Sequence, residues 1–183
     1  MIIDIGSGPN PRQFADIRMD MHDWPHVNLK HDLTQIPYPI ESNVADVIFF
    51  GDVIEHIDKF KLPEVLKEIY RITKPGGTVD VTCPDVQWIA ERIAKNDWNE
   101  MANVPWLHFF PDDPFENAML CLFGGWVNPN EHHIPGMGHV NGFNEKKLKR
   151  VLKEAGFAHV GRVPDTRNPE PARGVVLRML ATK

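Results

Sequence analysis

The sequence predicts an α/β fold, with a mostly parallel, twisted sheet that has an antiparallel edge strand and helices on both faces. Short apolar runs rich in β-branched residues alternate with longer segments in which apolar residues recur at helical spacing. The run at residues 44–50 is almost continuously apolar, which is typical of a central parallel strand covered on both sides. Two strand-like segments separated by a proline-rich loop end the chain and favour an antiparallel pair at the sheet edge.

The first half of the chain contains most of the expected strands and one clear helix. The short strand at residues 1–5 is followed at once by a loop rich in glycine and proline at residues 6–11. In the helix that begins near residue 59, apolar residues return every three or four positions until Lys-Pro-Gly-Gly at 74–77 stops it. The strands expected in this half are residues 1–5, 15–19, 27–33, 44–50 and 78–83.

The second half contains a segment of different character. After a helix around residues 88–93, residues 98–142 are rich in proline, glycine, histidine and aromatic side chains. Long connections of this kind are usually functional, so we expect an insertion that acts as a lid or substrate-binding segment. Asn144 and Gly156 are suitable N- and C-caps for a helix over 145–155. The closing strands are expected at 158–163 and 175–181.

Size, charge and cysteine content limit the class of protein. The 183 residues, of which 42% are hydrophobic, suffice for one domain over residues 1–183. The formal net charge of −5 gives no support for a nucleic-acid partner. Cys83 and Cys121 match no zinc or disulfide pattern, so we interpret both as buried small hydrophobic residues. Neither a signal peptide nor an apolar run of about 20 residues is present, which predicts a cytoplasmic protein that does not span a membrane.

The glycine-containing loop after the first strand is the first candidate binding site. At Gly6 and Gly8, backbone N–H groups can approach a ligand without a Cβ atom in the way. The dinucleotide fingerprint would need a third glycine where Pro11 stands, and its acidic residue would lie further on than Asp20, so NAD(P) is disfavoured. Asp20 follows the second strand, where a carboxylate can accept hydrogen bonds from both hydroxyls of a ribose. The alternative for Asp20 is a turn residue at a strand end.

An ordered set of motifs in the first half resembles the small class I S-adenosylmethionine-dependent methyltransferases of the type 11 kind. These motifs, with a Glu-Ala-Gly-Phe ending at 154–157, cover about half of the chain. They are Ile3-Asp4-Ile5-Gly6-Ser7-Gly8, Asp20, His31-Asp32-Leu33, Ile36-Pro37-Tyr38-Pro39, Asp46-Val47-Ile48, Asp52-Val53-Ile54-Glu55-His56-Ile57 and the segment 66–77 that ends in Lys-Pro-Gly-Gly. The resemblance implies a Rossmann-like methyltransferase fold with S-adenosylmethionine as cofactor.

The resemblance also assigns roles to individual residues. It places the loop residues at the methionine end of the cofactor, Asp20 at the ribose and the pair after the third strand at the adenine. The two residues after the fourth strand would border the methionine and the transferred methyl group. The cofactor-binding residues implied are Asp4, Gly6, Ser7, Gly8, Asp20, Asp32, Leu33, Gly51 and Asp52.

Methyl transfer to oxygen or nitrogen can need a general base, which makes histidines in the insertion of interest. We expect His139 to act as that base and Asp52 to orient the acceptor or the cofactor; a loop histidine that fixes the start of the last helix is the alternative for His139. The cluster Glu131, His132, His133 and His139 could ligate a metal, but adjacent histidines cannot easily direct both rings at one ion, so no metal is predicted. We interpret Glu55-His56 as a structural helix cap.

Two features depart from the family pattern. No helix precedes the first strand, so one sheet face would be covered by the insertion, by a second copy in a homodimer, or by nothing. Only a few residues separate Gly8 from Asp16, so the first crossover helix is shortened or lost.

Two functions remain open from the sequence. The first is a methyltransferase that acts on a small-molecule acceptor. In it, Trp106, Phe109, Phe110 and Trp126 would either line the acceptor site or form only the hydrophobic core of the insertion. The second is a non-catalytic binding or scaffolding subunit that keeps the same fold.

Overall fold

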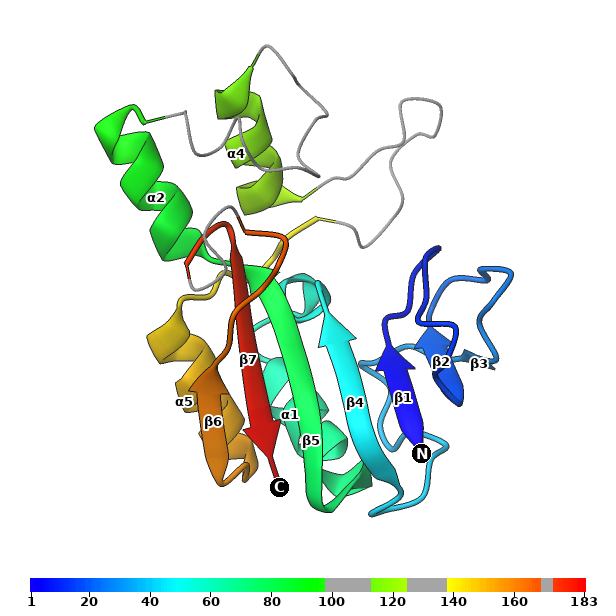
Figure 1. Cartoon of the computed structure of the whole chain (residues 1–183). Helices are drawn as coiled ribbons and strands as arrows, with labels where there is room; N and C mark the ends of the chain where they lie inside the picture. Colours follow the sequence, from blue (N-terminus) through cyan, green and yellow to red (C-terminus); the bar gives the residue numbers. More distant parts are fainter. Residues whose placement is uncertain (98–112, 125–137, 169–172) are drawn as a thin grey trace.

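The computed structural model describes residues 1–97, 113–124, 138–168 and 173–183 (Figure 1). Seven strands form one sheet in the order β3-β2-β1-β4-β5-β7-β6. The strands are β1 Ile2–Ile5, β2 Ile17–Asp20, β3 Leu29–Lys30, β4 Ala45–Gly51, β5 Thr73–Pro84, β6 His159–Arg162 and β7 Val176–Thr182. The helices are the 3₁₀ turn η1 Ile54–His56 and α1 Leu62–Ile72, α2 Val86–Lys95, α4 Pro114–Phe123 and α5 Glu145–Ala155.

The sheet is mixed in the way the sequence predicts. Strands β1 to β5 pair in parallel, β7 runs antiparallel to β5, and β6 runs antiparallel to β7. The β4 strand lies between β1 and β5, and Ile48 and Phe50 on it are fully buried. The expected α/β class with an antiparallel edge is therefore confirmed.

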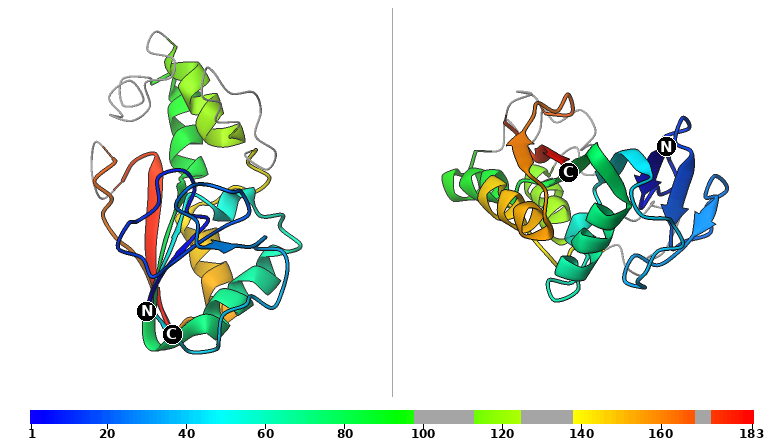
Figure 2. Two further views of the ribbon diagram at one scale, coloured as in Figure 1. Left: turned by 90° about the vertical axis from the view of Figure 1, so that its right-hand side faces the viewer. Right: turned by 90° about the horizontal axis from the view of Figure 1, so that it is seen from below.

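Helix placement differs from the expectation of helices on both faces. Helices α1 and α5 lie on the same face of the sheet, whereas α2 and α4 lie beyond the carboxyl ends of the strands (Figures 1 and 2). In the part of the chain that the structure describes, no helix covers the opposite face, because none occurs in the crossovers among β1, β2, β3 and β4. The prediction that the first crossover helix is lost is thus confirmed.

The residues predicted to end α1 and to cap α5 do so in the structure. Asn144 accepts a hydrogen bond from the N–H of Lys147, and Gly156 adopts a left-handed conformation with φ 118°. Helix α1 ends at Ile72, and the chain then continues directly into β5 through the glycine pair. Leu66 and Ile69 of α1 and Leu148 of α5 are buried in the main core.

One strand is shorter than predicted. Residues 27–33 contain only the two-residue strand β3. Past it, Asp32 Oδ1 accepts hydrogen bonds from the N–H and the hydroxyl of Thr34, and such an Asx turn replaces the strand ladder.

Part of the expected insertion forms a second hydrophobic cluster. Helix α4, which the sequence analysis did not predict, packs against α2 through Trp88, Ile89, Ala118 and Cys121, with Val175 and Val176 beneath them. Cys121 and Cys83 are both buried and free, as predicted. Among the described residues, no helix is long and apolar enough to cross a membrane.

Candidate functional site

The sheet has a point at which the direction of strand progression reverses. From β1 the chain proceeds through β2 and β3 to one side, and from β4 through β5 to the other. Ligands of open α/β sheets bind in the crevice beyond the carboxyl ends of the strands at such a switch point. The residues after β1, β2 and β4, namely Gly6 to Gly8, Asp20, and Gly51 with Asp52, lie at this edge.

The loop after β1 requires glycine for two different reasons. Gly6 has φ 65°, and a Cβ atom there would lie 2.4 Å from Val53 Cγ2. Gly8 has φ 60°, but a Cβ atom would meet nothing within 4 Å among the described residues. The loop is therefore packed at Gly6 and open at Gly8, where a ligand can approach the backbone.

Asp20 ties this loop to the second strand. Its Oδ2 accepts a hydrogen bond from Gly8 N at 2.9 Å, and its Oδ1 accepts one from His22 N at 2.8 Å. Gly6 N and Ser7 N both donate to the Met19 carbonyl. Each carboxylate oxygen of Asp20 retains a further lone pair that can accept a hydrogen bond from a ligand hydroxyl.

The side chains beside the loop are polar and buried. Ser7 Oγ has no hydrogen-bond partner among the described residues, although Ser7 is only 8% exposed. Asp4 accepts hydrogen bonds from both the N–H and the guanidinium of Arg12, at 2.8 and 3.0 Å. Arg12 lies 4.3 Å from the centre of the Phe49 ring and 3.5 Å from where a Gly51 Cβ would be, so its charge lies beside the end of β4.

Asp52, at the end of β4, is held in a left-handed conformation with φ 55°. Its N–H donates to the Thr82 carbonyl, and its two carboxylate oxygens accept hydrogen bonds from Thr82 Oγ1 at 3.2 Å and Arg167 Nη1 at 2.6 Å. Asp165 also holds Arg167. Burial lowers the pKa of Arg167, but the charges of Asp52 and Asp165 outweigh it and raise that pKa overall.

His139 lies at the same edge, in the segment 138–144 that precedes α5 and is called the strap below. Its N–H donates to the Phe123 carbonyl, and its Nδ1 lies 3.0 Å from the Cys121 carbonyl, so Nδ1 carries the proton of the neutral ring. Burial and the nearby His56 lower the pKa of His139. The ring is therefore neutral near pH 7, and its other nitrogen is an acceptor.

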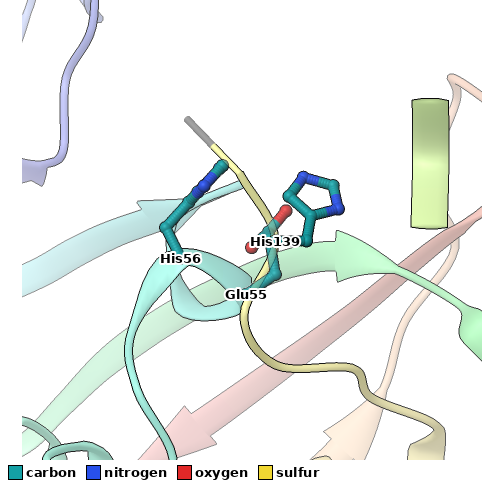
Figure 3. A group of neighbouring side chains, drawn as sticks. All are labelled: Glu55, His56 and His139. Carbon is teal, nitrogen blue, oxygen red and sulfur yellow. The ribbon is translucent and has the colours of Figure 1, made fainter. Parts of the chain in front are cut away.

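Two further side chains meet His139. Glu55 and His56 project from the η1 turn toward it (Figure 3), and the rings of His56 and His139 are 4.8 Å apart in an edge-to-face arrangement. The N-cap residue Val53 makes no side-chain cap, and Glu55 lies in the first turn, so the structural capping role expected for Glu55 and His56 stays a prediction. Burial and the charge of Asp52 raise the pKa of Glu55 well above its usual range.

A family model described as a methyltransferase domain matches residues 4–160. The chain belongs to this methyltransferase family. The match spans the glycine-containing loop, Asp20, Asp52 and His139, so the family assignment and the switch-point crevice concern the same part of the chain.

Similar proteins agree with this family. The demethylmenaquinone methyltransferases of Alkalihalophilus pseudofirmus and Listeria welshimeri are 25% and 24% identical, over 78% and 77% of this chain. The chain spans about half the length of these relatives, 53% and 51%.

Solved structures show the same fold at low identity. An S-adenosylmethionine-dependent methyltransferase from Archaeoglobus fulgidus aligns over 100% of this chain and 85% of its own, with TM-score 0.62 and 14% identity. The 1,6-didemethyltoxoflavin-N1-methyltransferase of Burkholderia thailandensis aligns over 100% and 70%, with TM-score 0.56 and 14% identity.

The methyltransferase domain brings most of the predicted site residues to one edge, but it adds residues that the sequence analysis missed. Arg12 lies in a loop that gave no signal beyond its proline content, and Arg167 lies within the proline-rich connection between β6 and β7. Asp32 and Leu33 follow β3, where the Leu33 carbonyl accepts a hydrogen bond from the Tyr38 hydroxyl. The rest of the cluster considered and rejected as a metal site, and the aromatic residues considered for an acceptor wall or a core, lie outside the described residues: Glu131, His132, His133, Trp106, Phe109, Phe110 and Trp126.

Proposed function

We propose that this methyltransferase domain transfers a methyl group from S-adenosylmethionine to an oxygen or nitrogen atom of a small-molecule acceptor. The observation that carries the proposal is the Gly8–Asp20 connection at the switch point, because it joins a glycine loop to a carboxylate in the way a nucleoside requires. The relatives are named for small-molecule acceptors, demethylmenaquinone and 1,6-didemethyltoxoflavin, which supports the same substrate class here.

The crevice suits the adenosine half of the cofactor. Asp20 would accept hydrogen bonds from the two ribose hydroxyls, since its oxygens keep lone pairs beyond those used by Gly8 and His22. The open space beside Gly8 leaves room for the ligand to approach. Asp32 and Leu33, after β3, would border the adenine.

The methionine half would lie between β1 and β4. The buried hydroxyl of Ser7 needs a partner, and a polar group of the cofactor would satisfy it. The Arg12 guanidinium can pair with the cofactor's carboxylate while it remains bound to Asp4, because it has five N–H donors. Gly51 lets the chain pass close to this part of the ligand.

When bound, the cofactor supplies an electrophilic methyl group on a sulfonium. The protein's residues then have to align the acceptor with that methyl and exclude water. Asp52 would orient the acceptor or the cofactor's ammonium group, and Thr82 and Arg167 fix its direction. His139 would take the acceptor's proton on the nitrogen that does not face Cys121. Helix α4 and the strap with His139, the described parts of the expected insertion, would lie over the acceptor.

Calorimetric titration with S-adenosylhomocysteine tests the proposal. We expect micromolar binding, about −8 kcal/mol, because such sites bind the product as well as the substrate. Asp20→Asn should weaken it by about 1.5–3 kcal/mol, the range for hydrogen bonds to a charged group. The matched control Asp23→Asn changes a carboxylate whose side chain is 85% exposed and should leave binding unchanged. The absence of binding at millimolar ligand would overturn the proposal.

Turnover is separable from binding. His139→Gln should retain affinity for S-adenosylhomocysteine, and both His139→Gln and Asp52→Asn should slow methyl transfer once an acceptor is found. Equal transfer by these variants and the wild type would contradict their roles. If the wild type binds the cofactor but transfers no methyl group to any acceptor of a broad panel, the result would favour a non-catalytic binding or scaffolding subunit.

The proposal includes a homodimer that covers the helix-free face of the sheet. On this side Phe14 is 64% exposed and packs edge-on against Phe49. Sedimentation velocity at micromolar concentration should give a dimer; a monomer would contradict this part.

A further inference from the structure

Glu55 and His56, which the methyl-transfer proposal does not use, lie next to His139, which it uses as the base. Each residue offers one ligand atom, and these three atoms lie within 4.8 Å of one another. Two of the side chains come from the η1 turn and the third from the strap before α5 (Figure 3). The strap is fastened to the turn, because Val140 N and Asn141 N both donate to the Glu55 carbonyl at 3.0 Å. The three residues are thus held together by the backbone.

Glu55 is a buried carboxylate with one unpaired oxygen. It is 2% exposed, and its Oε2 has no hydrogen-bond partner among the described residues. A buried carboxylate oxygen without a partner is costly unless a cation or a proton compensates the charge. Asp52 lies on the same side and adds negative charge. A cation bound at Glu55 would compensate this buried negative charge.

The two histidines are oriented as metal ligands usually are. His139 Nδ1 lies 3.0 Å from the Cys121 carbonyl, and His56 Nδ1 lies 3.2 Å from the Gly138 carbonyl. Metal-binding histidines commonly donate one ring N–H to a backbone carbonyl, which fixes the ring and directs the other nitrogen to the ion. Cys121 belongs to helix α4, and Gly138 forms an isolated bridge with Gly124. The positions of both carbonyls are therefore fixed by backbone hydrogen bonds.

We propose that Glu55, His56 and His139 form a binding site for a divalent transition-metal cation of the Zn²⁺ type. Two imidazoles and one carboxylate are ligands that such ions accept at about 2.0–2.2 Å, with water in the remaining position. Ligand atoms around one ion are then about 3–4 Å apart, so modest side-chain rotations bring the present group to bonding distance.

The proposal goes beyond methyl transfer and does not depend on it. One lone pair of His139 cannot both bind a cation and accept the acceptor's proton. A bound cation should therefore slow any transfer that uses His139 as the base, while the cofactor crevice at Asp20 stays accessible.

The test is a titration of the full chain, freed of metal by a chelator, with Co²⁺ followed by visible absorbance and with Zn²⁺ followed by calorimetry. We expect one strong site per chain and ligand-field bands for Co²⁺. Glu55→Gln and His56→Ala should each weaken binding by at least about tenfold, as even outer-sphere changes commonly do. His159→Ala, which removes an exposed histidine on β6, is the matched control and should bind like the wild type.

The outcomes are distinct. Failure to bind either ion at 1:1 stoichiometry, or unchanged affinity in Glu55→Gln and His56→Ala, would overturn the site. Circular dichroism checks that each variant is folded, and if Glu55→Gln is not, the half-buried His56 decides the question through His56→Ala. Titration of the same samples with S-adenosylhomocysteine reports on the cofactor site alone, so the failure of one proposal leaves the other standing.

Discussion

Gly6 and Gly8 share a left-handed backbone conformation but not their surroundings. At Gly6 the space for a side chain is filled by Val53, which follows β4, so the glycine couples the two central strands at their carboxyl ends. At Gly8 the space is open on the side of Asp20. The first glycine therefore serves packing and the second keeps room for a ligand.

Gly6→Ala and Gly8→Ala should consequently differ in stability. A non-glycine residue in this conformation costs about 1–2 kcal/mol, which Gly8→Ala should show. Gly6→Ala should cost more, because the Cβ atom also meets Val53. Urea unfolding measures both, and the double variant Gly6→Ala/Val53→Ala should recover part of the added loss. Equal costs for the two single variants would contradict this reading of the loop.

At the scale of elements, helix α1 holds the connection between β3 and β4, in which the structure describes no helix. Glu68 accepts a hydrogen bond from Tyr38 N at 2.7 Å, and Arg71 donates to the Ile40 carbonyl at 2.7 Å. The two side chains also form an ion pair with each other. The connection that precedes β4 is thereby fixed to the helix below the sheet.

This link makes stability depend on pH. Hydrogen bonds from Arg71 lower the pKa of Glu68 despite its burial. The stabilisation is thus present above the unfolded pKa, about 4.3 for glutamate, and is lost as pH falls through the lower folded value. Glu68→Gln should lower the free energy of unfolding at pH 7 by about 1.5–3 kcal/mol and flatten its fall in acid.

Glu64→Gln is the control for Glu68→Gln, since Glu64 is an exposed residue of the same helix. Its effect should stay within about 1 kcal/mol, as expected for a surface ion pair. Equal effects of the two variants in urea unfolding at pH 7 and pH 3.5 would contradict the role of Glu68.

At the scale of the whole molecule, the sequence predicted what depends on local chemistry. Asn144 acts through its side chain on a backbone N–H three residues along the chain, and Gly156 and the glycines after β1 act through their own backbone. Their roles could therefore be predicted from neighbouring residues. The approach of Glu55 to His139, and of Arg12 to Phe49, depends on tertiary packing between segments far apart in the chain. Helix α4 is apolar on most sides, so its sequence shows no apolar stripe at helical spacing. The helix could therefore not be predicted from the sequence pattern.

The two hydrophobic clusters should differ in stability. Cys83 belongs to the main core, whereas Cys121 belongs to the smaller cluster between α2 and α4. Burial raises the pKa of both thiols, that of Cys121 to about 12, so neither should react in the native state. With rising urea, Cys121 should be labelled before Cys83, because fewer contacts hold its cluster. Single-cysteine variants and mass spectrometry measure this, and simultaneous labelling would indicate one cooperative unit.

The central claim is that the crevice between β1 and β4 binds the cofactor. A crystal structure of the protein with S-adenosylhomocysteine tests it most directly. We expect ligand density at the carboxyl ends of β1, β2 and β4. Both ribose hydroxyls should form hydrogen bonds with Asp20, and the carboxylate of the ligand should lie near Arg12. Density elsewhere on the molecule, or a ribose that makes no contact with Asp20, would contradict it.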